Sequence, residues 1–220
     1  MRFKLILTGA TGLVGEGVLL ECLEHPAVMQ VLSVSRKSCG RQHPKLTECL
    51  VPDFMELDAV ANQLSGYDAC FYCAGISSRG MTEAAYSHVT YDVPLHFAET
   101  LLRLNPQMIF CHMSGGHADS SEKGRVMWAR VKGRAENAMM RLGFRRVYNF
   151  RPGFMKPTDG QRNVPPFYRA ISRLYPVLRV LLPSQVLTMQ QVGLAMIESV
   201  LKGYPKQVLE IKDMQALAGS

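Results

Sequence analysis

The segment Thr8-Gly9-Ala10-Thr11-Gly12-Leu13-Val14-Gly15 decides the fold, because it joins a short apolar run to an amphipathic stretch. The run ahead of it, Phe3–Leu7, is typical of a buried β-strand. The stretch that it opens, Gly12–Glu24, repeats apolar side chains at helical spacing. A strand, a glycine-rich turn and a helix in this order bring free amide N–H groups at the helix N-terminus up to an anion. We therefore expect a site for the diphosphate of a dinucleotide.

Each glycine of this segment has a separate physical task. Gly9 permits a tight turn, Gly12 lets the backbone approach a diphosphate without a side chain in the way, and Gly15 lets the helix pack closely on the sheet. Thr11 and Leu13 lie between them and are expected to share in cofactor binding. The alternative is a glycine-rich turn without a ligand, but the position between a strand and a helix favours the dinucleotide site.

Apolar runs alternate with amphipathic stretches along the rest of the chain, which predicts a parallel sheet with helices on both faces. We expect strands at Phe3–Leu7, Val28–Val34, Thr47–Val51, Asp68–Cys73, Gln107–Met113, Arg146–Phe150 and Gln207–Ile211. We expect helices at Gly12–Glu24, Thr82–Leu104 with a bend at Pro94, Val126–Leu142, Pro165–Leu182 and Met189–Leu201. The predicted fold class is α/β, a Rossmann-type doubly wound sheet in one domain over residues 1–220. Residues 151–206 are expected to add a small helical cap on the substrate side.

The composition is that of a folded globular protein. Of 220 residues, 47% are hydrophobic and 20% charged, and the sequence contains no apolar run long enough for a membrane span. The chain start does not have the form of an export signal, so we expect a cytoplasmic protein with reduced cysteines and without contact to a membrane. Cys70 and Cys73 form a C-x-x-C pair, but in a strand they point to opposite faces, so we expect no metal site there.

The net charge of +7 comes from one part of the chain, because residues 121–181 hold 14 basic and 3 acidic residues. Such a segment can attract an anionic ligand or a nucleic acid. The arginines are dispersed and are not interleaved with aromatic residues, which disfavours nucleic acid. Solvated helix faces and contacts to a cofactor phosphate are the preferred explanation.

The end of the second predicted strand carries the signal for the type of dinucleotide. An acidic residue at this place usually holds the ribose hydroxyls of NAD, whereas here the chain reads Ser33-Val34-Ser35-Arg36-Lys37. Arg36 can fork onto a 2′-phosphate, with Ser35 and Lys37 beside it, which favours NADP over NAD. The alternative is that Arg36 and Lys37 are ordinary surface residues. Asp53 follows the third strand, where it either accepts from the adenine amino group or only shapes a turn.

Five motifs together resemble the short-chain dehydrogenase/reductase superfamily in its atypical and extended branches. They are the segment Thr8–Gly15, Cys73-Ala74-Gly75 after the fourth strand, Ser114 after the fifth, Lys132 on the next helix, and Arg151-Pro152-Gly153 after the sixth strand. The chain looks most similar to small epimerase-like proteins related to the Tat-interacting oxidoreductase. The resemblance implies that Cys73, Ala74, Gly75, Lys132, Arg151, Pro152 and Gly153 contact the cofactor.

The resemblance also implies a catalytic set, and this chain departs from it. Active members place a tyrosine four residues before the lysine, on the same helix face, but here Trp128 precedes Lys132. An indole N–H donates a hydrogen bond and does not serve as a proton-transfer acid. The expected catalytic positions are therefore Ser114, Lys132 and Trp128 in place of the tyrosine. Other candidates for the missing acid are Tyr91, His112, His117 and Ser120.

Two function hypotheses follow from these residues. The first is an NADP(H)-binding oxidoreductase or epimerase-like enzyme that acts on a small carbonyl or alcohol substrate. The second is a non-catalytic dinucleotide sensor that binds a regulatory protein partner, which Trp128 favours. Assembly as a homodimer is compatible with both.

Overall fold

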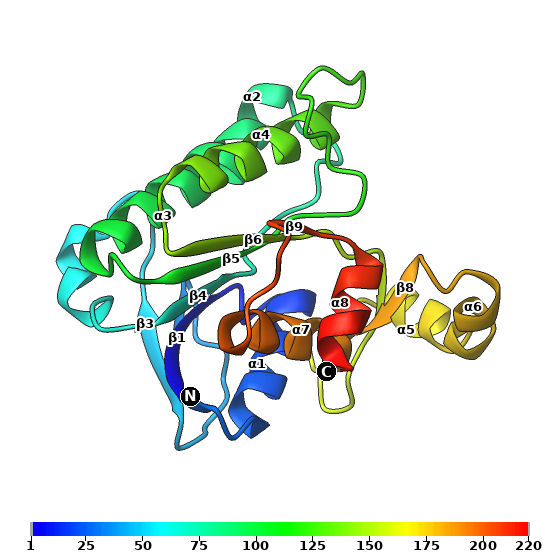
Figure 1. Cartoon of the computed structure of the whole chain (residues 1–220), viewed down its shortest axis with the longest axis horizontal. Helices are drawn as coiled ribbons and strands as arrows, with labels where there is room; N and C mark the ends of the chain where they lie inside the picture. Colours follow the sequence, from blue (N-terminus) through cyan, green and yellow to red (C-terminus); the bar gives the residue numbers. More distant parts are fainter. Residues whose placement is uncertain (1, 220) are drawn as a thin grey trace.

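The computed structural model describes residues 2–219 and contains a seven-stranded sheet in which every pair of neighbours is parallel (Figure 1). Its strand order is β3-β2-β1-β4-β5-β6-β9. The strands are β1 (Phe3–Thr8), β2 (Val28–Ser35), β3 (Leu46–Leu50), β4 (Ala69–Tyr72), β5 (Ile109–Met113), β6 (Arg146–Phe150) and β9 (Val208–Leu209). The order reverses between β1 and β4, so the crevice at their carboxyl ends is the place where such sheets bind ligands. The predicted Rossmann-type fold is confirmed.

Helices cover both faces of the sheet (Figure 1). One face carries α1 (Leu13–Glu24), α7 (Met189–Leu201) and α8 (Ile211–Ala218), and the other carries α2 (Glu83–Ser87), α3 (Val93–Leu104) and α4 (Met127–Arg141). A 3₁₀ segment spans Asp58–Gln63. The central strands β1, β4, β5 and β6 are buried on both sides, so their alternate residues contribute to two separate cores. Cys70 lies in one core and Cys73 packs against the other, as the strand geometry predicts.

Helix α7 belongs to the body of the fold rather than to a cap. Val192 and Met196 of α7 are fully buried in the core beneath α1. Gly17 on α1 makes the close approach feasible, because a Cβ there would collide with the side chain of Met189. The predicted cap range of residues 151–206 is therefore too wide. What projects from the body lies between β7 (Phe154–Lys156) and β8 (Val186–Thr188), two parallel strands that form a second sheet and place Met155 and Leu187 in the core.

Proline explains where two predicted helices are interrupted. The predicted helix Thr82–Leu104 consists of α2, a π-helical turn at His88–Asp92 and α3, whose first turn contains Pro94. The predicted helix Pro165–Leu182 is two short helices, α5 (Pro166–Ser172) and α6 (Tyr175–Leu181), with Pro176 in the first turn of α6. Proline has no N–H to donate to the preceding turn. The first helical run therefore continues through a π-helical turn before Pro94, whereas the second is broken between α5 and α6.

The carboxyl-terminal elements differ from the prediction in a similar local way. The expected strand Gln207–Ile211 is shorter, and α8 follows it directly. A capping box starts α8, in which Glu210 and Asp213 each accept from the other's backbone N–H. Within residues 2–219, no helix has the length and apolar character needed to cross a membrane.

Candidate functional site

The turn after β1 has the geometry that its three glycines predict. Gly9 has a φ of +77°, and a Cβ there would lie 2.7 Å from the backbone of Cys73. A Cβ on Gly15 would collide with the carbonyl oxygen of Gly9, whereas one on Gly12 would meet only that oxygen at 3.4 Å. Gly9 and Gly15 are thus required because a side chain at either position would collide with the backbone. At Gly12 the space that a side chain would occupy is free for a ligand. Gly12 is also the N-cap of α1 and has no side-chain cap, so the helix start keeps amide N–H groups for a ligand.

Thr8 joins the glycine turn to the end of β4. Its buried Oγ1 accepts hydrogen bonds from the backbone N–H groups of Cys73 and Ala74, each at 3.1 Å. These two amides are therefore already satisfied inside the protein. Cys73 and Ala74 form a wall of the site and do not offer the N–H donors that a cofactor phosphate would need. Gly75, which follows them, is exposed.

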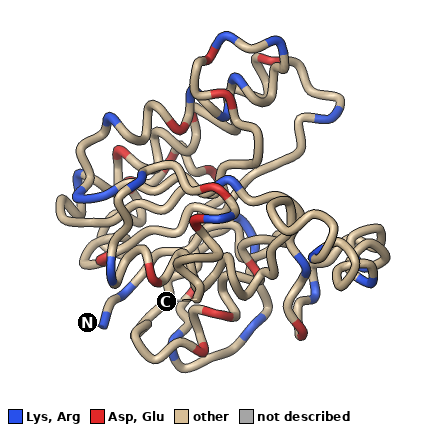
Figure 2. The backbone as a smooth tube through the Cα atoms, turned by 45° about the vertical axis from the view of Figure 1, so that its right-hand side comes forward, with Lys and Arg blue, Asp and Glu red and all other residues tan. Residues whose placement is uncertain are grey.

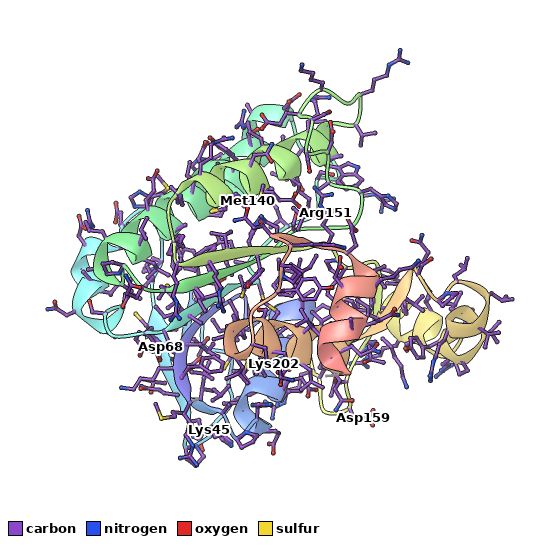
Figure 3. All side chains as sticks on the ribbon, in the orientation of Figure 1. Lys45, Asp68, Met140, Arg151, Asp159 and Lys202 are labelled. Atoms are coloured by element: carbon purple, nitrogen blue, oxygen red, sulfur yellow. The ribbon has the colours of Figure 1, made fainter. Side chains whose placement is uncertain are left out.

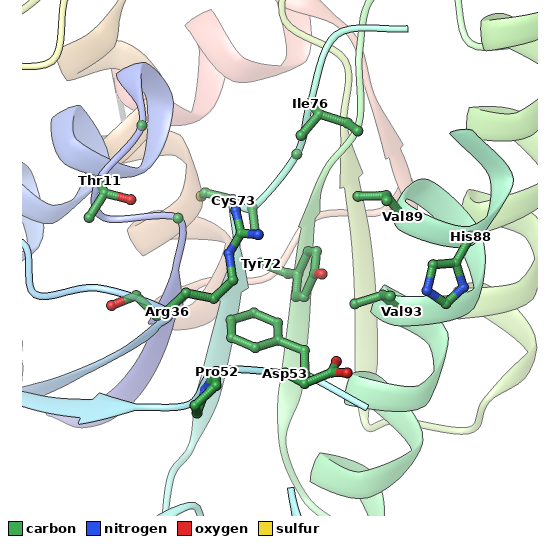
Figure 4. A pocket seen from close by; sticks show the side chains of 16 residues that line it. Thr11, Arg36, Pro52, Asp53, Tyr72, Cys73, Ile76, His88, Val89 and Val93 are labelled. Carbon is green, nitrogen blue, oxygen red and sulfur yellow. The ribbon is translucent and has the colours of Figure 1, made fainter. Parts of the chain in front are cut away.

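A cleft of about 530 Å³ runs along the carboxyl ends of β1, β2 and β4 (Figure 4). Nine of the predicted cofactor residues line it: Gly9, Thr11, Gly12, Ser35, Arg36, Asp53, Cys73, Ala74 and Gly75. Seven further lining residues were not predicted: Pro52, Phe54, Tyr72, Ile76, His88, Val89 and Val93. The second group is mostly apolar and suits the flat faces of a nucleoside. The sequence contains no motif that marks these seven residues, because they come from several separate elements.

Arg36 is the positive charge of this cleft. Its side chain extends into the cleft in Figure 4, and it also lines an adjoining hollow of about 410 Å³ together with Thr11, Lys37 and Ser38. Ser35 does not point its hydrogen at this hollow, because its Oγ donates to the carbonyl of Lys37 at 2.7 Å. Ser35 therefore shapes the turn that carries Arg36 and Lys37.

Asp53 fits both interpretations that its position allows. It lines the cleft, yet its carboxylate accepts from the backbone N–H of Met55 at 2.9 Å and its carbonyl accepts from that of Glu56 at 3.1 Å. The side chain thus shapes a local turn through one carboxylate oxygen, while Asp53 still lines the cleft where the adenine is expected.

Ser114 and Lys132 lie together, as predicted. Lys132 Nζ donates to the backbone carbonyl of Ser114 at 2.9 Å, and a Cβ on Gly115 would lie 3.3 Å from Lys132 Cε. The hydroxyl of Ser114 is buried and has no hydrogen-bond partner among residues 2–219. Burial lowers the pKa of Lys132, and the negative charge of Glu136 only partly opposes this effect. None of these residues lines the cleft described above, and Trp128 is half-buried in the first turn of α4.

His112 is a neutral core residue at ordinary pH. It is buried on the same face of β5 as Ser114, because the two are two residues apart on a strand. Burial lowers its pKa to about 4, and the nearby Lys132 charge adds to this effect. Its Nδ1 lies 3.0 Å from Asn149 Oδ1, and an amide oxygen can only accept, so Nδ1 carries the hydrogen. His112 is therefore not an imidazolium acid.

The side chain of Arg151 is engaged by hydrogen bonds inside the protein. The guanidinium makes a two-pronged contact with the fully buried carboxylate of Glu136 and also donates to Glu210 at 3.2 Å and to Ser120 Oγ at 2.6 Å. The hydrogen bond with Glu136 raises the pKa of Arg151. Figure 3 shows Arg151 between α4 and the start of α8. Arg151 fixes the end of β6 in this structure, and its predicted contact to a cofactor remains a prediction.

Pro152 and Gly153 continue this structural role. The carbonyl of Pro152 accepts from the N–H of Gly116 at 3.0 Å, which holds the loop after β5. A Cβ on Gly153 would collide with the carbonyl of Gln185 next to β8. Their predicted contacts to a cofactor remain a prediction.

The other candidates for a proton donor are engaged elsewhere. The ring of Tyr91 lies 3.9 Å from the guanidinium carbon of Arg134. Arg134 and Lys132 leave α4 on opposite sides, since two residues turn a helix by about 200°, so this contact does not bring Tyr91 to Lys132. Ser120 accepts from Arg151, and His117 is exposed with a φ of 66°.

A parallel sheet with this order, a glycine turn that leaves Gly12 open and a cleft at the strand reversal define a dinucleotide-binding protein. The sequence profile of the NAD dependent epimerase/dehydratase family matches residues 5–118, which is just over half of the chain. The chain belongs to this family.

Individual proteins agree with the assignment. The chain is 28% identical over 166 residues to the protein fmp52, mitochondrial, of Aspergillus fumigatus, covering 71% of this chain and 67% of that one. It is 28% identical over 154 residues to the protein HTATIP2 of Rattus norvegicus, covering 69% and 62%.

Solved structures share the fold at low sequence identity. The Bordetella bronchiseptica enzyme WbmF in complex with NAD+ superposes with a TM-score of 0.66 at 15% identity, over 98% of this chain and 77% of that one. Glucuronic acid dehydrogenase from Chromohalobacter salexigens gives a TM-score of 0.67 at 15% identity, over 95% and 76%.

Proposed function

We propose that the protein binds NADP(H) and uses it for oxidation and reduction of a small carbonyl or alcohol substrate. The observation that carries the cofactor choice is Arg36, which lines both the cleft and the adjoining hollow beside Thr11. A guanidinium pairs with a phosphate through two parallel hydrogen bonds, and no acidic residue follows β2 to hold a free ribose hydroxyl. The hollow next to Arg36 would take the 2′-phosphate.

The residues of the site fit a bound dinucleotide. A Cβ on Gly12 would fill space that nothing else in the protein needs, whereas Gly9 and Gly15 are fixed by packing. Ser114 Oγ is a buried hydroxyl with no hydrogen-bond partner in the described part of the chain, and such a group is satisfied when a ligand oxygen accepts from it. Diphosphate binding at the helix start and substrate binding at Ser114 therefore occupy the two unsatisfied parts of the site.

When bound, the nicotinamide ring supplies or accepts the hydride. Ser114 Oγ donates a hydrogen bond to the substrate oxygen and so orients the carbonyl. Lys132 is the charged acid beside Ser114, and its lowered pKa makes it a better proton donor than an ordinary lysine. We propose that Lys132 takes over the proton transfer that a tyrosine performs elsewhere, because Trp128 has no transferable proton.

The cofactor choice is tested by calorimetric titration of the pure protein with NADPH and NADH. The Arg36→Glu variant should lose NADPH affinity on the order of 100-fold, because a charge-assisted pair is replaced by repulsion. Its NADH affinity should change by less than about threefold, because NADH has no 2′-phosphate for residue 36 to contact. The exposed Arg145, changed to Glu, provides the control for net charge. Equal losses for both cofactors would remove the phosphate assignment, and absence of heat with either would remove dinucleotide binding.

A second candidate function is a dinucleotide sensor without turnover. It rests on Trp128 at the tyrosine position and on Lys132, whose ammonium is held by a backbone carbonyl. A sensor would bind NADPH with the Arg36 dependence above and yet consume none of it across a panel of aldehydes, ketones and quinones. NADPH oxidation that Lys132→Ala abolishes would favour the enzyme.

A further inference from the structure

Helices α5 and α6 form an arm, residues 165–182, that projects from the body of the protein (Figure 1). Neither helix contains a buried residue. Seven of its large apolar side chains are exposed: Phe167, Ile171, Leu174, Val177, Val180, Leu181 and Leu182. Only five other large apolar side chains are exposed elsewhere in residues 2–219, and these are scattered. An apolar surface concentrated in this way marks an interaction site.

The apolar side chains follow helical spacing. Phe167 and Ile171 are four residues apart on α5, and Val177, Val180 and Leu181 occupy one face of α6. Val180 is 78% exposed and Leu181 69% exposed, although both are as apolar as residues of the core. Each helix therefore presents an amphipathic face that the protein itself leaves uncovered.

The arm has one sign of charge. Residues 160–197 contain four arginines and no acidic residue, and three of the arginines lie on the arm (Figure 2). Among the described residues, Arg169, Arg173 and Arg179 take part in no ion pair. The surface that covers the arm must therefore accept apolar side chains and supply negative charge.

A fixed base holds the arm at its root. The ring of Tyr168 stacks on Phe154 of β7 with centroids 4.9 Å apart, and Lys156 Nζ lies 5.5 Å from the ring centre of Tyr175. Strand β7 pairs with β8, which leads into the buried helix α7. The root is thus built into the protein, while Val180 and Leu181 extend away from it.

From this combination we infer that the α5–α6 arm docks on the surface of a bilayer containing anionic phospholipid. Apolar side chains on one face and unpaired arginines around them are the pattern of an interfacial helix, which lies in the headgroup region without crossing the membrane. A second copy of the chain fits less well, because a two-fold contact would bring the three arginines of one arm against those of the other without an acidic partner. The inference departs from the sequence-based expectation of no membrane contact and is independent of the cofactor.

Co-sedimentation with vesicles tests the inference on the whole protein. Vesicles of 30% phosphatidylglycerol in phosphatidylcholine should bind it, and vesicles of pure phosphatidylcholine should bind it much less. Raising the salt from 0.05 to 0.5 M should weaken the binding, because the arginines are screened. Each arginine near an anionic surface contributes roughly fivefold to the partition coefficient.

Two double variants separate the charge from the apolar face. Arg169→Glu with Arg173→Glu should lower the partition coefficient by at least about 25-fold, whereas Arg141→Glu with Arg145→Glu, the same charge change at exposed positions away from the arm, should leave more than half of it. Val180→Ser with Leu181→Ser, which leaves the net charge unchanged, should lower it by more than about tenfold. All variants should keep the melting temperature, since α5 and α6 bury no residue.

Three results would overturn the inference. The first is equal binding to anionic and neutral vesicles, or binding to neither. The second is loss of binding in the control variant to the same degree as in the arm variants. The third is a stable dimer in sedimentation equilibrium that Val180→Ser with Leu181→Ser converts to a monomer, which would assign the arm to self-association.

Discussion

Lys132 on α4 donates a hydrogen bond from Nζ to the backbone carbonyl of Ser114 across 2.9 Å. The lysine thereby holds the end of β5 next to the buried Ser114 hydroxyl, which has no hydrogen-bond partner among the residues that the structure describes. Gly115 makes this contact feasible, because a side chain there would press on the lysine stem. Two of the three predicted catalytic positions are thus coupled before any ligand enters.

The first prediction concerns the pH dependence of turnover in the direction of carbonyl reduction. The pKa of Lys132 is lowered by burial, so its ammonium form is lost at a lower pH than that of an ordinary lysine. If Lys132 is the proton donor, kcat is constant at low pH and falls as the pH rises through this lowered pKa. A pH profile of NADPH oxidation with an active substrate measures this fall in kcat. Lys132→Arg, which stays protonated, should lose the falling limb. An unchanged limb in that variant would exclude Lys132 as the acid.

The second prediction concerns Trp128. A tyrosine at this position would lie four residues before Lys132 on the same face of α4 and would supply a phenol beside an ammonium group. We expect Trp128→Tyr to raise kcat by roughly 100-fold, the lower end of the usual contribution of a positioned acid, with little change in the NADPH dissociation constant. Trp128→Phe is the matched control. Equal rates for the two variants would show that residue 128 does not reach the reacting atoms.

The third prediction separates packing from binding among the glycines. Gly15→Ala should lower the free energy of unfolding by roughly 2–4 kcal/mol, because the new methyl group meets the carbonyl of Gly9. Gly12→Ala should leave the free energy of unfolding within about 1 kcal/mol, because its Cβ has 3.4 Å of clearance, and yet weaken NADPH binding by more than about tenfold. Urea denaturation and calorimetric titration measure the two effects. A stable Gly12→Ala protein with full affinity would place the diphosphate elsewhere.

The sequence predicted the sheet well because local signals there agree with one another. Apolar runs mark the buried strands, and the capping box at Thr188 and Gln191 marks the start of α7. One error lies where contacts distant in sequence decide, because α7 is a core helix rather than part of a cap through its packing against α1. The other error is local, since the break between α5 and α6 falls next to Pro176 in the first turn of α6.

The sequence predicted which residues lie at the site better than it predicted what each of them does. The glycine turn, Arg36, Ser114 and Lys132 lie where the pattern places them. Arg151 could not be understood from the sequence, because its partner Glu136 lies on another element and nothing in the sequence signals a buried carboxylate. Tyr72 lines the cleft, although its strand alone suggests only a core residue.

The fourth prediction concerns the buried pair at Arg151. Removing one partner leaves the other charge in the interior, so Glu136→Ala should lower the free energy of unfolding by roughly 3–5 kcal/mol. Glu210→Ala removes the exposed partner of the same guanidinium together with the N-cap of α8, and should cost only about 1–2 kcal/mol. Urea denaturation of the three proteins at pH 7 compares them. Similar losses for both variants would contradict the central role of the buried contact.

The last prediction concerns stability in acid and rests on Glu16, which lies in the first turn of α1 and is almost fully buried. Burial acts to raise its pKa, but hydrogen bonds from the Arg41 side chain and from the backbone N–H groups of Arg162 and Asn163 outweigh burial and lower the pKa. A lowered pKa in the folded state stabilises the protein above the ordinary pKa of glutamate, and this stabilisation is lost as the pH falls through the folded value. Glu16→Gln should therefore lower the free energy of unfolding by roughly 1–3 kcal/mol at pH 7 and by less at pH 3. Urea denaturation at several pH values between 3 and 7 measures the free energy of unfolding of wild type and of Glu16→Gln. Glu24→Gln, at the exposed end of α1, is the control. A constant difference between wild type and Glu16→Gln at every pH would show that the ionised carboxylate is not what ties the loops at Arg41 and Arg162 to α1.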